Sequence, residues 1–324
     1  MEKAIQELIS RIESKDYSSL DSLKREISKR YKLNKFPSNI DILEHLDESN
    51  KEIFKNILLS KPVRTLSGVA PIAVMTKPIA CAHGKCTFCP GGPKSNFGDV
   101  PQSYTGNEPS TMRAIRSNYD PYLIVFNRIE QYILLNHIPD KAEIIIQGGT
   151  FCSFPKDYQD EVVIYILKAM NDFSEMFFIN DKLDFDKFKD FFELPGSVKD
   201  KERGLKIADK ILKFKGNSNI EKEQLRNETS KIRSTALVIE TKPDWCMESE
   251  IDEILKLGTT RVELGIQTLK NDVLKATNRG HTLKDSVKSI QLLKDSFLKF
   301  TTHCMPGLPN TTRDEDISMF EELF

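Results

Sequence analysis

Short apolar runs alternate with amphipathic helical patterns along the chain from about residue 61 onward. Five of these runs have the length and composition of buried strands, at 69–75, 142–147, 236–240, 260–266 and 300–305. Helical spacing separates them, as in DPYLIVFNRIEQYILL and TLKDSVKSIQLLKD. Strands that alternate with helices build parallel sheets from βαβ units, and their chemistry sits on the loops after the strands. The sequence therefore predicts an α/β fold with a closed or partly closed β/α barrel.

Two segments depart from this alternation. Residues 1–60 have helical spacing throughout, as in AIQELISRI, and predict a small helical domain before a barrel at 61–324. The segment at about 174–216 predicts a helical insertion between the second and third strands. Its phenylalanines are expected to form a small core of their own: Phe177, Phe178, Phe185, Phe188, Phe191 and Phe192. Because only five strands precede the last helical pattern, DEDISMFEELF, we expect the barrel to be C-terminally incomplete.

The charge balance excludes a uniformly basic nucleic-acid-binding chain. The 324 residues contain 47 Lys and Arg against 48 Asp and Glu, so any nucleic-acid surface must be a local patch. No stretch approaches the roughly 18 consecutive apolar residues of a membrane span, and the first residues lack the apolar segment of a secretory signal. These features predict a soluble, cytoplasmic protein without membrane contact.

Three of the six cysteines are crowded into nine positions after the first predicted strand. Cys81, Cys86 and Cys89 have the spacing Cys-x4-Cys-x2-Cys and precede Pro-Gly-Gly-Pro. Clustered thiolates favour zinc, copper(I) or iron–sulfur clusters. A zinc site needs a fourth ligand, for which His83 is available. A cluster held by three thiolates leaves one iron open to bind a substrate. The spacing favours the cluster over zinc, and buried thiols without a ligand are the third reading.

A three-cysteine loop after the first strand of a β/α barrel is the arrangement of radical S-adenosylmethionine (SAM) enzymes. The run KPVRTLSGVAPIAVMTKPIACAHGKCTFCPGGP resembles more closely the archaeal forms of the catalytic subunit of Elongator, the tRNA wobble-uridine acetyltransferase. Further segments resemble that family in the same order, namely PQSYTGNEPSTMRAIRSNYDPYL, DKAEIIIQGGTF, IETKPDWC, TRVELGIQTL, NRGHT and MPGLPN.

The resemblance implies a reaction and its cofactors. A [4Fe-4S] cluster held by Cys81, Cys86 and Cys89 would bind and cleave SAM. The resulting radical would activate acetyl-CoA, and a carboxymethyl group would be added to C5 of the wobble uridine. This radical-SAM acyltransferase is expected to bind the tRNA anticodon loop. Because family members continue into an acetyltransferase domain, the resemblance also implies that this domain belongs to a missing part or to a separate chain.

The resemblance assigns further contacts. Gly148, Gly149 and Thr150 follow the second strand, where the family uses a glycine turn against the SAM amino group. A plain strand-to-loop turn is the alternative for these glycines. Glu240 and Gln267 end the third and fourth strands and are candidates for SAM contacts, with buried backbone partners as the alternative.

Lys141 and an N-terminal basic run complete the predicted contacts. Lys141, before the second strand, is implied to contact acetyl-CoA, although most lysines are simply solvated. Lys and Arg that contact phosphates supply most of the sequence-independent affinity for RNA. Proteins recognise RNA sequence mainly at bases turned out of single-stranded loops, and the wobble base of an anticodon loop is such a base. Charge alone allows a solvated helix face, and the resemblance favours tRNA contacts by the run of Lys24, Arg25, Lys29, Arg30, Lys32 and Lys35.

Two rival functions remain open from the sequence. In the first, the chain is a zinc- or cluster-stabilised tRNA-binding remnant without activity of its own. In the second, it is a radical-SAM enzyme acting on another substrate, which the barrel motifs alone would permit. The N-terminal resemblance argues against the second.

Overall fold

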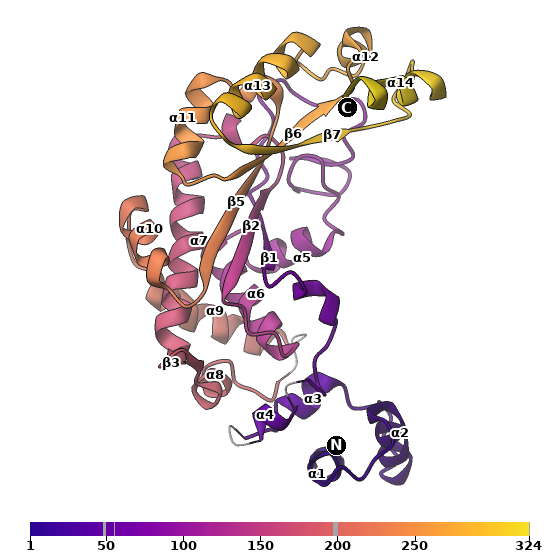
Figure 1. Ribbon diagram of the computed structural model, residues 1–324, viewed down its shortest axis with the longest axis vertical. Coiled ribbons are helices and arrows are strands. Elements are labelled where there is room, and N and C mark those ends of the chain that lie inside the picture. The colour runs from indigo at the N-terminus through magenta and orange to yellow at the C-terminus, as the bar shows by residue number, and fades with distance from the viewer. Residues whose placement is uncertain (48–49, 55, 197–199, 324) are drawn as a thin grey trace.

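A five-stranded parallel sheet organises the computed structural model, which describes residues 1–47, 50–54, 56–196 and 200–323 (Figure 1). The strand order is β1-β2-β5-β6-β7. This confirms the α/β fold and all five predicted strands, with one or two residues added or lost at most ends, and three more at the start of β5. The strand bounds are Ala70–Met75 for β1, Lys141–Gln147 for β2, Arg233–Thr241 for β5, Arg261–Gln267 for β6 and Lys299–Cys304 for β7.

Helices pack against one side of the sheet and connect its parallel strands. Contacts join α6 to β1, both α7 and α10 to β5, and α13 to β7. Successive side chains of a strand point to opposite faces of the sheet. Every second residue of β2 is therefore fully buried, namely Ala142, Ile144 and Ile146. The helices between the strands are α5 (Pro109–Arg116), α6 (Pro121–Leu134), α7 (Lys156–Phe177), α10 (Ile220–Thr229), α11 (Glu248–Lys256), α12 (Asn271–Ala276) and α13 (Leu283–Asp295).

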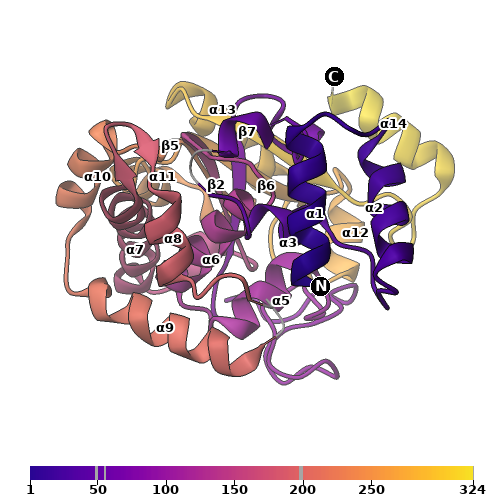
Figure 2. The ribbon, with the colours of Figure 1, turned by 90° about the horizontal axis from the view of Figure 1, so that it is seen from below.

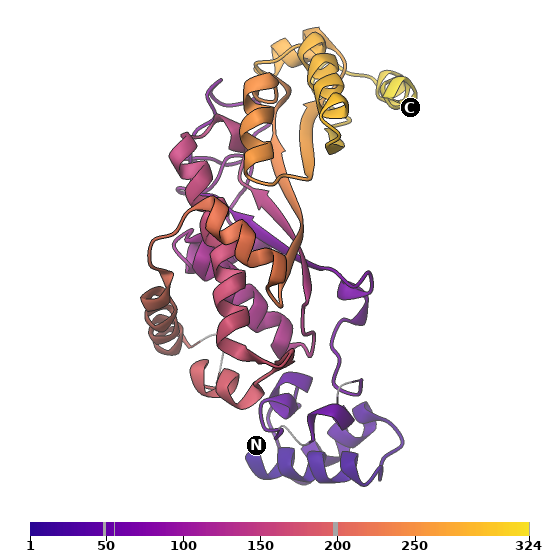
Figure 3. The ribbon, with the colours of Figure 1, turned by 60° about the vertical axis from the view of Figure 1, so that its left-hand side comes forward.

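The N-terminal helices gather at one end of the molecule, beyond the amino ends of the strands (Figure 3). They are α1 (Glu2–Glu13), α2 (Leu20–Arg30), α3 (Asn39–Leu43) and α4 (Lys51–Phe54). Helices α1 and α2 lie side by side, as Figure 2 shows from below. Leu8, Ile12 and Ile27 are buried among them. The hydroxyl of Ser19 accepts a hydrogen bond from Ser22 N and caps α2.

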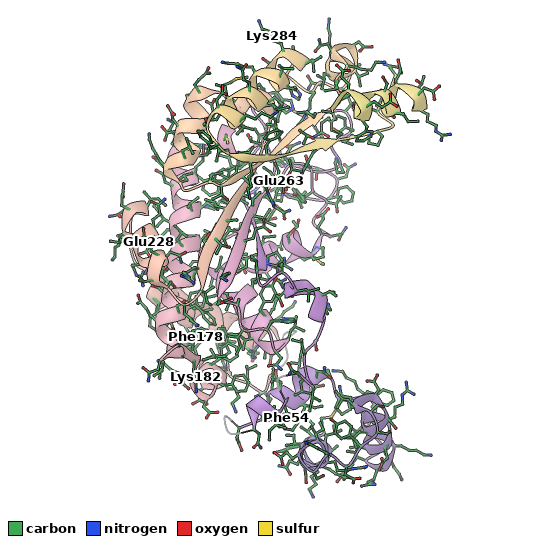
Figure 4. The ribbon with its side chains drawn as sticks, viewed as in Figure 1. Phe54, Phe178, Lys182, Glu228, Glu263 and Lys284 are labelled. Carbon is green, nitrogen blue, oxygen red and sulfur yellow. The ribbon has the colours of Figure 1, made fainter. Side chains whose placement is uncertain are left out.

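The segment 174–216 contains a small hairpin that its sequence pattern does not predict. Strands β3 (Phe178–Ile179) and β4 (Lys182–Leu183) pair antiparallel at the end of α7, and Figure 4 labels Phe178 and Lys182 there. Helices α8 (Phe185–Phe191) and α9 (Lys201–Lys215) follow. Residues 197–199, between these two helices, lie outside the described part of the chain.

The phenylalanines of this segment do not form a separate core. The ring of Phe173 on α7 packs at tilted angles against the rings of Phe177 and Phe188, and also against Phe126 of α6. The prediction of a core of their own is therefore wrong in this respect: they extend the core of the sheet's helical layer. Arg203 of α9 fixes the arrangement, because it donates at 2.9 Å to the buried carboxylate of Glu130 on α6 and also to Phe192 O.

Three 3₁₀ turns and one further helix complete the described elements. The turns lie at Pro62–Thr65, Phe151–Ser153 and Pro243–Trp245, and the helix is α14 (Arg313–Leu323). Across the described ranges, none of the helices has the length and apolar character needed to cross a membrane.

Candidate active site

The cysteine loop lies over the carboxyl ends of the strands, at the edge where the sequence predicts chemistry. Cys81 and Cys89 line a cavity of about 680 Å³, and Cys86 lies beside its wall. The carboxyl ends of β5, β6 and β7, the loop after β2 and residues 103–104 supply the other walls. Charged and polar residues from these walls include Tyr104, Thr150, Glu240, Lys242, Glu263, Gln267, Arg279 and His303.

Each of the three sulfurs has a polar hydrogen-bond partner. Gln102 Nε2 donates to Cys89 Sγ at 3.0 Å, and Thr150 Oγ1 lies 3.6 Å from Cys81 Sγ. Around Cys86 Sγ, His83 Nε2 lies at 3.2 Å and Arg279 Nη1 at 3.7 Å.

These partners suit sulfur ligands to a metal. Hydrogen-bond donors and nearby cations favour the thiolate form, which is the form that binds metal. Burial is the largest influence on Cys81 and raises the pKa of its thiol, while the charges of Lys242 and Arg279 oppose that rise. Three cysteines with such partners are the donor type that an iron–sulfur cluster uses, although within the described residues no three His, Cys, Asp or Glu side chains converge on one metal position.

The Pro-Gly-Gly turn after Cys89 needs both of its glycines. A Cβ on Gly91 would lie 1.6 Å from the backbone oxygen of Tyr104, and one on Gly92 would lie 2.7 Å from Gln102 Oε1. The turn therefore packs closely against residues 101–104, which places the Gln102 amide on the Cys89 sulfur.

The glycine pair after β2 also has a conformation that other residues rarely adopt. Gly148 has φ +127° and Gly149 has φ +111°. A Cβ on Gly148 would lie 2.1 Å from Thr76 Oγ1, and one on Gly149 would lie 3.8 Å from Cys81 Sγ. Bare backbone therefore forms the wall of the cavity next to the cysteine loop, where a ligand can approach closely.

Two carboxylates from neighbouring strands face the cavity. Glu240 of β5 and Glu263 of β6 are register partners, and Figure 4 labels Glu263 at the middle of the sheet. Tyr104 donates to both oxygens of Glu240, at 3.2 and 3.1 Å. Glu263 pairs at 2.9 Å with Nε2 of His303, and this contact is the largest influence raising the pKa of His303. The site thus has a buried acid and an imidazole–carboxylate pair in one cavity.

Comparisons with known proteins agree with this geometry. Residues 78–323 match the family model described as the radical SAM superfamily. The chain belongs to the radical SAM superfamily. Residues 1–66 match the model described as the ELP3 N-terminal domain.

The relatives of this radical SAM chain include proteins named tRNA uridine(34) acetyltransferase and Elongator complex protein 3. The chain is 44% identical over 95% of its length to the tRNA uridine(34) acetyltransferase of Methanocaldococcus infernus, and 46% identical over 89% to that of Methanocaldococcus jannaschii. It is also 36% identical over 99% of its length to Elongator complex protein 3 of Drosophila melanogaster. The chain spans about half the length of these relatives, 50%, 46% and 51% respectively.

A solved structure supports the same relation. The archaeal Methanocaldococcus infernus Elp3 with N-terminus deletion (1-46) superposes with a TM-score of 0.54 at 35% identity, covering 79% of this chain and 42% of that one. The resemblance to the Elongator catalytic subunit, stated from sequence motifs, is thereby confirmed.

In this radical SAM fold, most of the predicted site residues come together. Cys81, Cys89, Gly149, Thr150, Glu240 and Gln267 all line this cavity. Gly148 is next to Gly149 in the chain, and Cys86 contacts the lining residue Arg279. Gln267 has a left-handed backbone, φ +68°, at an irregularity that ends β6. Their roles toward SAM stay predictions.

Lys141 lies apart from this group. It begins β2, so six residues at about 3.3 Å each separate it from Gln147 at the carboxyl end, roughly 20 Å away. It is exposed and lines a different cavity of about 700 Å³, shared with Arg233 and Lys256. Its contact with acetyl-CoA stays a prediction, and it would have to involve a part of that molecule far from the cysteine loop.

The basic N-terminal residues differ in their surroundings. Arg25, Lys29 and Lys32 are exposed. Lys24 is largely buried and donates to Asn39 at 2.5 Å, Arg30 is paired with Glu7 and Glu26, and Lys35 lies 4.0 Å from Asp41. Lys24 is therefore withdrawn from solvent, Arg30 and Lys35 are paired but still exposed, and Arg25, Lys29 and Lys32 present their charge to solvent.

The sequence reasoning missed three side chains that contact or face the cysteine loop: Gln102, Lys242 and Arg279. Each belongs to a motif quoted for the resemblance, PQSYTGNEP, IETKPDWC and NRGHT respectively. Lys242 is only 2% exposed, although lysine is rarely buried. The sequence signal that could have indicated Lys242 is its position directly after a buried strand, inside a motif quoted for the resemblance.

Replacing Glu240 by Gln is expected to change how stability depends on pH. Burial, its largest influence, raises the pKa of Glu240 to about 7. The pKa of this carboxyl group is about 4.5 in the unfolded chain and about 7 in the folded protein. The stability that the neutral acid contributes is therefore fully present below about pH 4.5 and is lost as the pH rises through about 7. Because each pKa unit corresponds to about 1.4 kcal/mol, Glu240→Gln should gain at least about 1 kcal/mol over the parent protein at pH 8.

Urea unfolding at pH 5 and pH 8 measures this effect. Glu322→Gln, on the exposed surface of α14, is the control and should leave the difference between the two pH values unchanged. Equal gains by Glu240→Gln at both pH values would contradict the assignment of an acid held neutral by burial.

Proposed function

We propose that this protein is a radical-SAM tRNA-modifying enzyme that uses acetyl-CoA to build a carboxymethyl group on C5 of the wobble uridine. One observation carries the proposal: three cysteine sulfurs with polar partners stand at the cavity formed by the carboxyl ends of four parallel strands. The relatives named tRNA uridine(34) acetyltransferase and Elongator complex protein 3 support the substrate.

The residues of the cavity divide the work. Cys81, Cys86 and Cys89 would hold a [4Fe-4S] cluster, which with SAM bound supplies a 5′-deoxyadenosyl radical when it is reduced. Gly148 and Gly149 let the ligand approach backbone next to the cysteine loop. The surrounding walls would limit the access of water to a reactive radical.

The carboxylates give the cavity a means of moving protons. His303, held by Glu263, can accept a proton from a bound group and return it, since an imidazole titrates near neutral pH. Tyr104 keeps Glu240 oriented through two hydrogen bonds. Both pairs line the same cavity as Cys81 and Cys89.

Anaerobic loading with iron and sulfide, followed by dithionite and SAM, tests the proposal. The expected result is about four irons and four sulfides per chain and release of 5′-deoxyadenosine measured by mass spectrometry. One zinc per chain without sulfide, and no 5′-deoxyadenosine, would support the zinc-stabilised RNA-binding remnant instead. Release of 5′-deoxyadenosine that tRNA and acetyl-CoA do not change would point to a radical-SAM enzyme with another substrate.

We further propose that the exposed basic residues of the N-terminal region contact tRNA phosphates. Arg25 and Lys29 lie on the exposed face of α2, and Lys32 follows the C-cap residue of that helix. Lys and Arg that neutralise phosphates supply affinity that falls with salt.

The triple replacement of Arg25, Lys29 and Lys32 by Ala is expected to weaken tRNA binding at least about tenfold at low salt. The slope of log K against log salt should shrink by about one for each phosphate that is no longer neutralised. Binding isotherms at several salt concentrations measure both. The matched control replaces three exposed lysines of α9, Lys201, Lys206 and Lys213. Equal losses of affinity for the two triple variants would contradict a specific role for the N-terminal patch.

A further inference from the structure

Cys86 has a different environment from the other two cysteines of the loop. Its sulfur lies 3.2 Å from an imidazole nitrogen of His83 and 3.7 Å from a guanidinium nitrogen of Arg279. Cys81 and Cys89 have instead a neutral hydroxyl and a neutral amide as partners. Cys86 Sγ therefore has a cationic group in direct contact, whereas the charges of Lys242 and Arg279 act on Cys81 at longer range.

Lys242 determines which nitrogen of His83 carries the proton. Its Nζ lies 3.1 Å from His83 Nδ1, and an ammonium group can only donate, so Nδ1 must accept. A neutral imidazole that accepts at Nδ1 carries its hydrogen on Nε2, and this Nε2–H points at Cys86 Sγ. Lys242, His83 and Cys86 thus form one chain of hydrogen bonds that all run toward the sulfur.

The surroundings hold this chain in place. Gly280, with φ +84°, packs so closely on His83 that a Cβ there would lie 2.7 Å from His83 Cβ. Lys242 is 2% exposed, and Asp244 Oδ2 at 3.2 Å is its other partner. Arg279 donates to Gly265 O at 2.6 Å, which fixes the guanidinium beside the sulfur. Asn278 donates at 2.9 Å to the backbone oxygen of residue 85 and ties the turn 277–280 to the cysteine loop.

We propose that His83, oriented by Lys242, is a hydrogen-bond donor to the Cys86 sulfur, and that with Arg279 it makes the cluster easier to reduce. The inference rests on the proposed function only in requiring a cluster on the three cysteines. Hydrogen bonds and net positive charge at cluster sulfurs raise the reduction potential, because they stabilise the added electron. Both nitrogens of His83 are occupied, one by Lys242 and one by the sulfur, so His83 is a positioning residue and not a metal ligand.

The test measures the reduction midpoint of the reconstituted cluster by electron paramagnetic resonance, in four variants. His83→Leu removes the donor, and His83→Gln keeps an N–H donor. Lys242→Met removes the buried charge. Lys85→Met removes an exposed charge from the same loop and is the control, since solvent screens that charge.

His83→Leu and Lys242→Met are expected to disfavour reduction about tenfold, which for one electron is about 59 mV. His83→Gln and the control should stay within a third of that shift. If His83→Leu and Lys242→Met both held full iron and sulfide and left the reduction midpoint unchanged, the proposal would be overturned. So would a failure of both His83→Gln and His83→Leu to hold a cluster, since that result would make His83 a ligand. Assembly in the Gln variant alone supports the donor role.

The result is independent of the overall reaction. A protein whose cluster shows these shifts but forms no product with tRNA would retain the present inference and lose the proposed function. A protein that forms product although the variants leave the reduction midpoint unchanged would retain the proposed function and lose the present inference.

Discussion

Replacing Cys86 by Ser is expected to abolish release of 5′-deoxyadenosine from SAM. The loss should exceed the roughly 10–100-fold that follows from changing a partner of a metal ligand, because here a sulfur ligand itself is removed. Ser is nearly the same size as Cys, so the packing beside His83 and Arg279 is kept. The measurement is 5′-deoxyadenosine by mass spectrometry after anaerobic loading, together with iron and sulfide content.

The matched control removes a thiol outside the site. Cys246 is fully buried, and burial raises the pKa of its thiol to about 11, so it stays neutral and inert. Cys246→Ala should retain SAM cleavage within a few-fold. If Cys86→Ser kept its cleavage rate while holding a complete cluster, Cys86 would not be a ligand.

Replacing Gly148 by Ala is expected to destabilise the protein by about 2–4 kcal/mol and to prevent SAM binding. The backbone at φ +127° costs a residue with a Cβ about 1–3 kcal/mol, and overpacking against Thr76 Oγ1 adds to this. The turn also borders the cysteine loop, so any shift that relieves the clash displaces the cavity wall. Urea unfolding gives the stability, and equilibrium dialysis with SAM gives binding.

Gly204 provides a control of opposite sign. It lies within α9, and a Cβ added there would meet nothing within 4 Å. Gly204→Ala should stabilise the protein by about 0.5–1 kcal/mol, since glycine in a helix loses more conformational freedom on folding. Equal effects at Gly148 and Gly204 would contradict the account of the turn.

The strands and the cysteine loop could be predicted because their signals are local. A central parallel strand is buried on both faces, so a run such as ALVIE, with Leu237, Val238 and Ile239 buried in succession, is almost continuously apolar and stands out against amphipathic helices. The position of the cysteines after the first of these runs then places them at the carboxyl edge of the sheet. Gly148 and Gly149 follow a strand directly, and their spacing needs no knowledge of distant residues.

Other features depend on contacts between residues far apart in the chain. The hairpin of β3 and β4 has only two residues in each strand, too few for an alternating pattern to be detected. Lys24 and Lys242 are buried although their residue type is usually solvated, because Asn39 and Asp244 respectively give each ammonium a partner. The environment of Cys86 likewise arises from His83 in its own loop and from Arg279, which is distant in the sequence, and spacing alone does not reveal it.

The most direct measurement is a reaction of the protein with reduced iron–sulfur sites, SAM, tRNA and acetyl-CoA labelled with ¹³C in its methyl group. Digestion of the tRNA to nucleosides and mass spectrometry then report the label. The account predicts ¹³C in a carboxymethyl group on C5 of the wobble uridine, absent when SAM is omitted. Unlabelled tRNA from a protein that releases 5′-deoxyadenosine from SAM would contradict it.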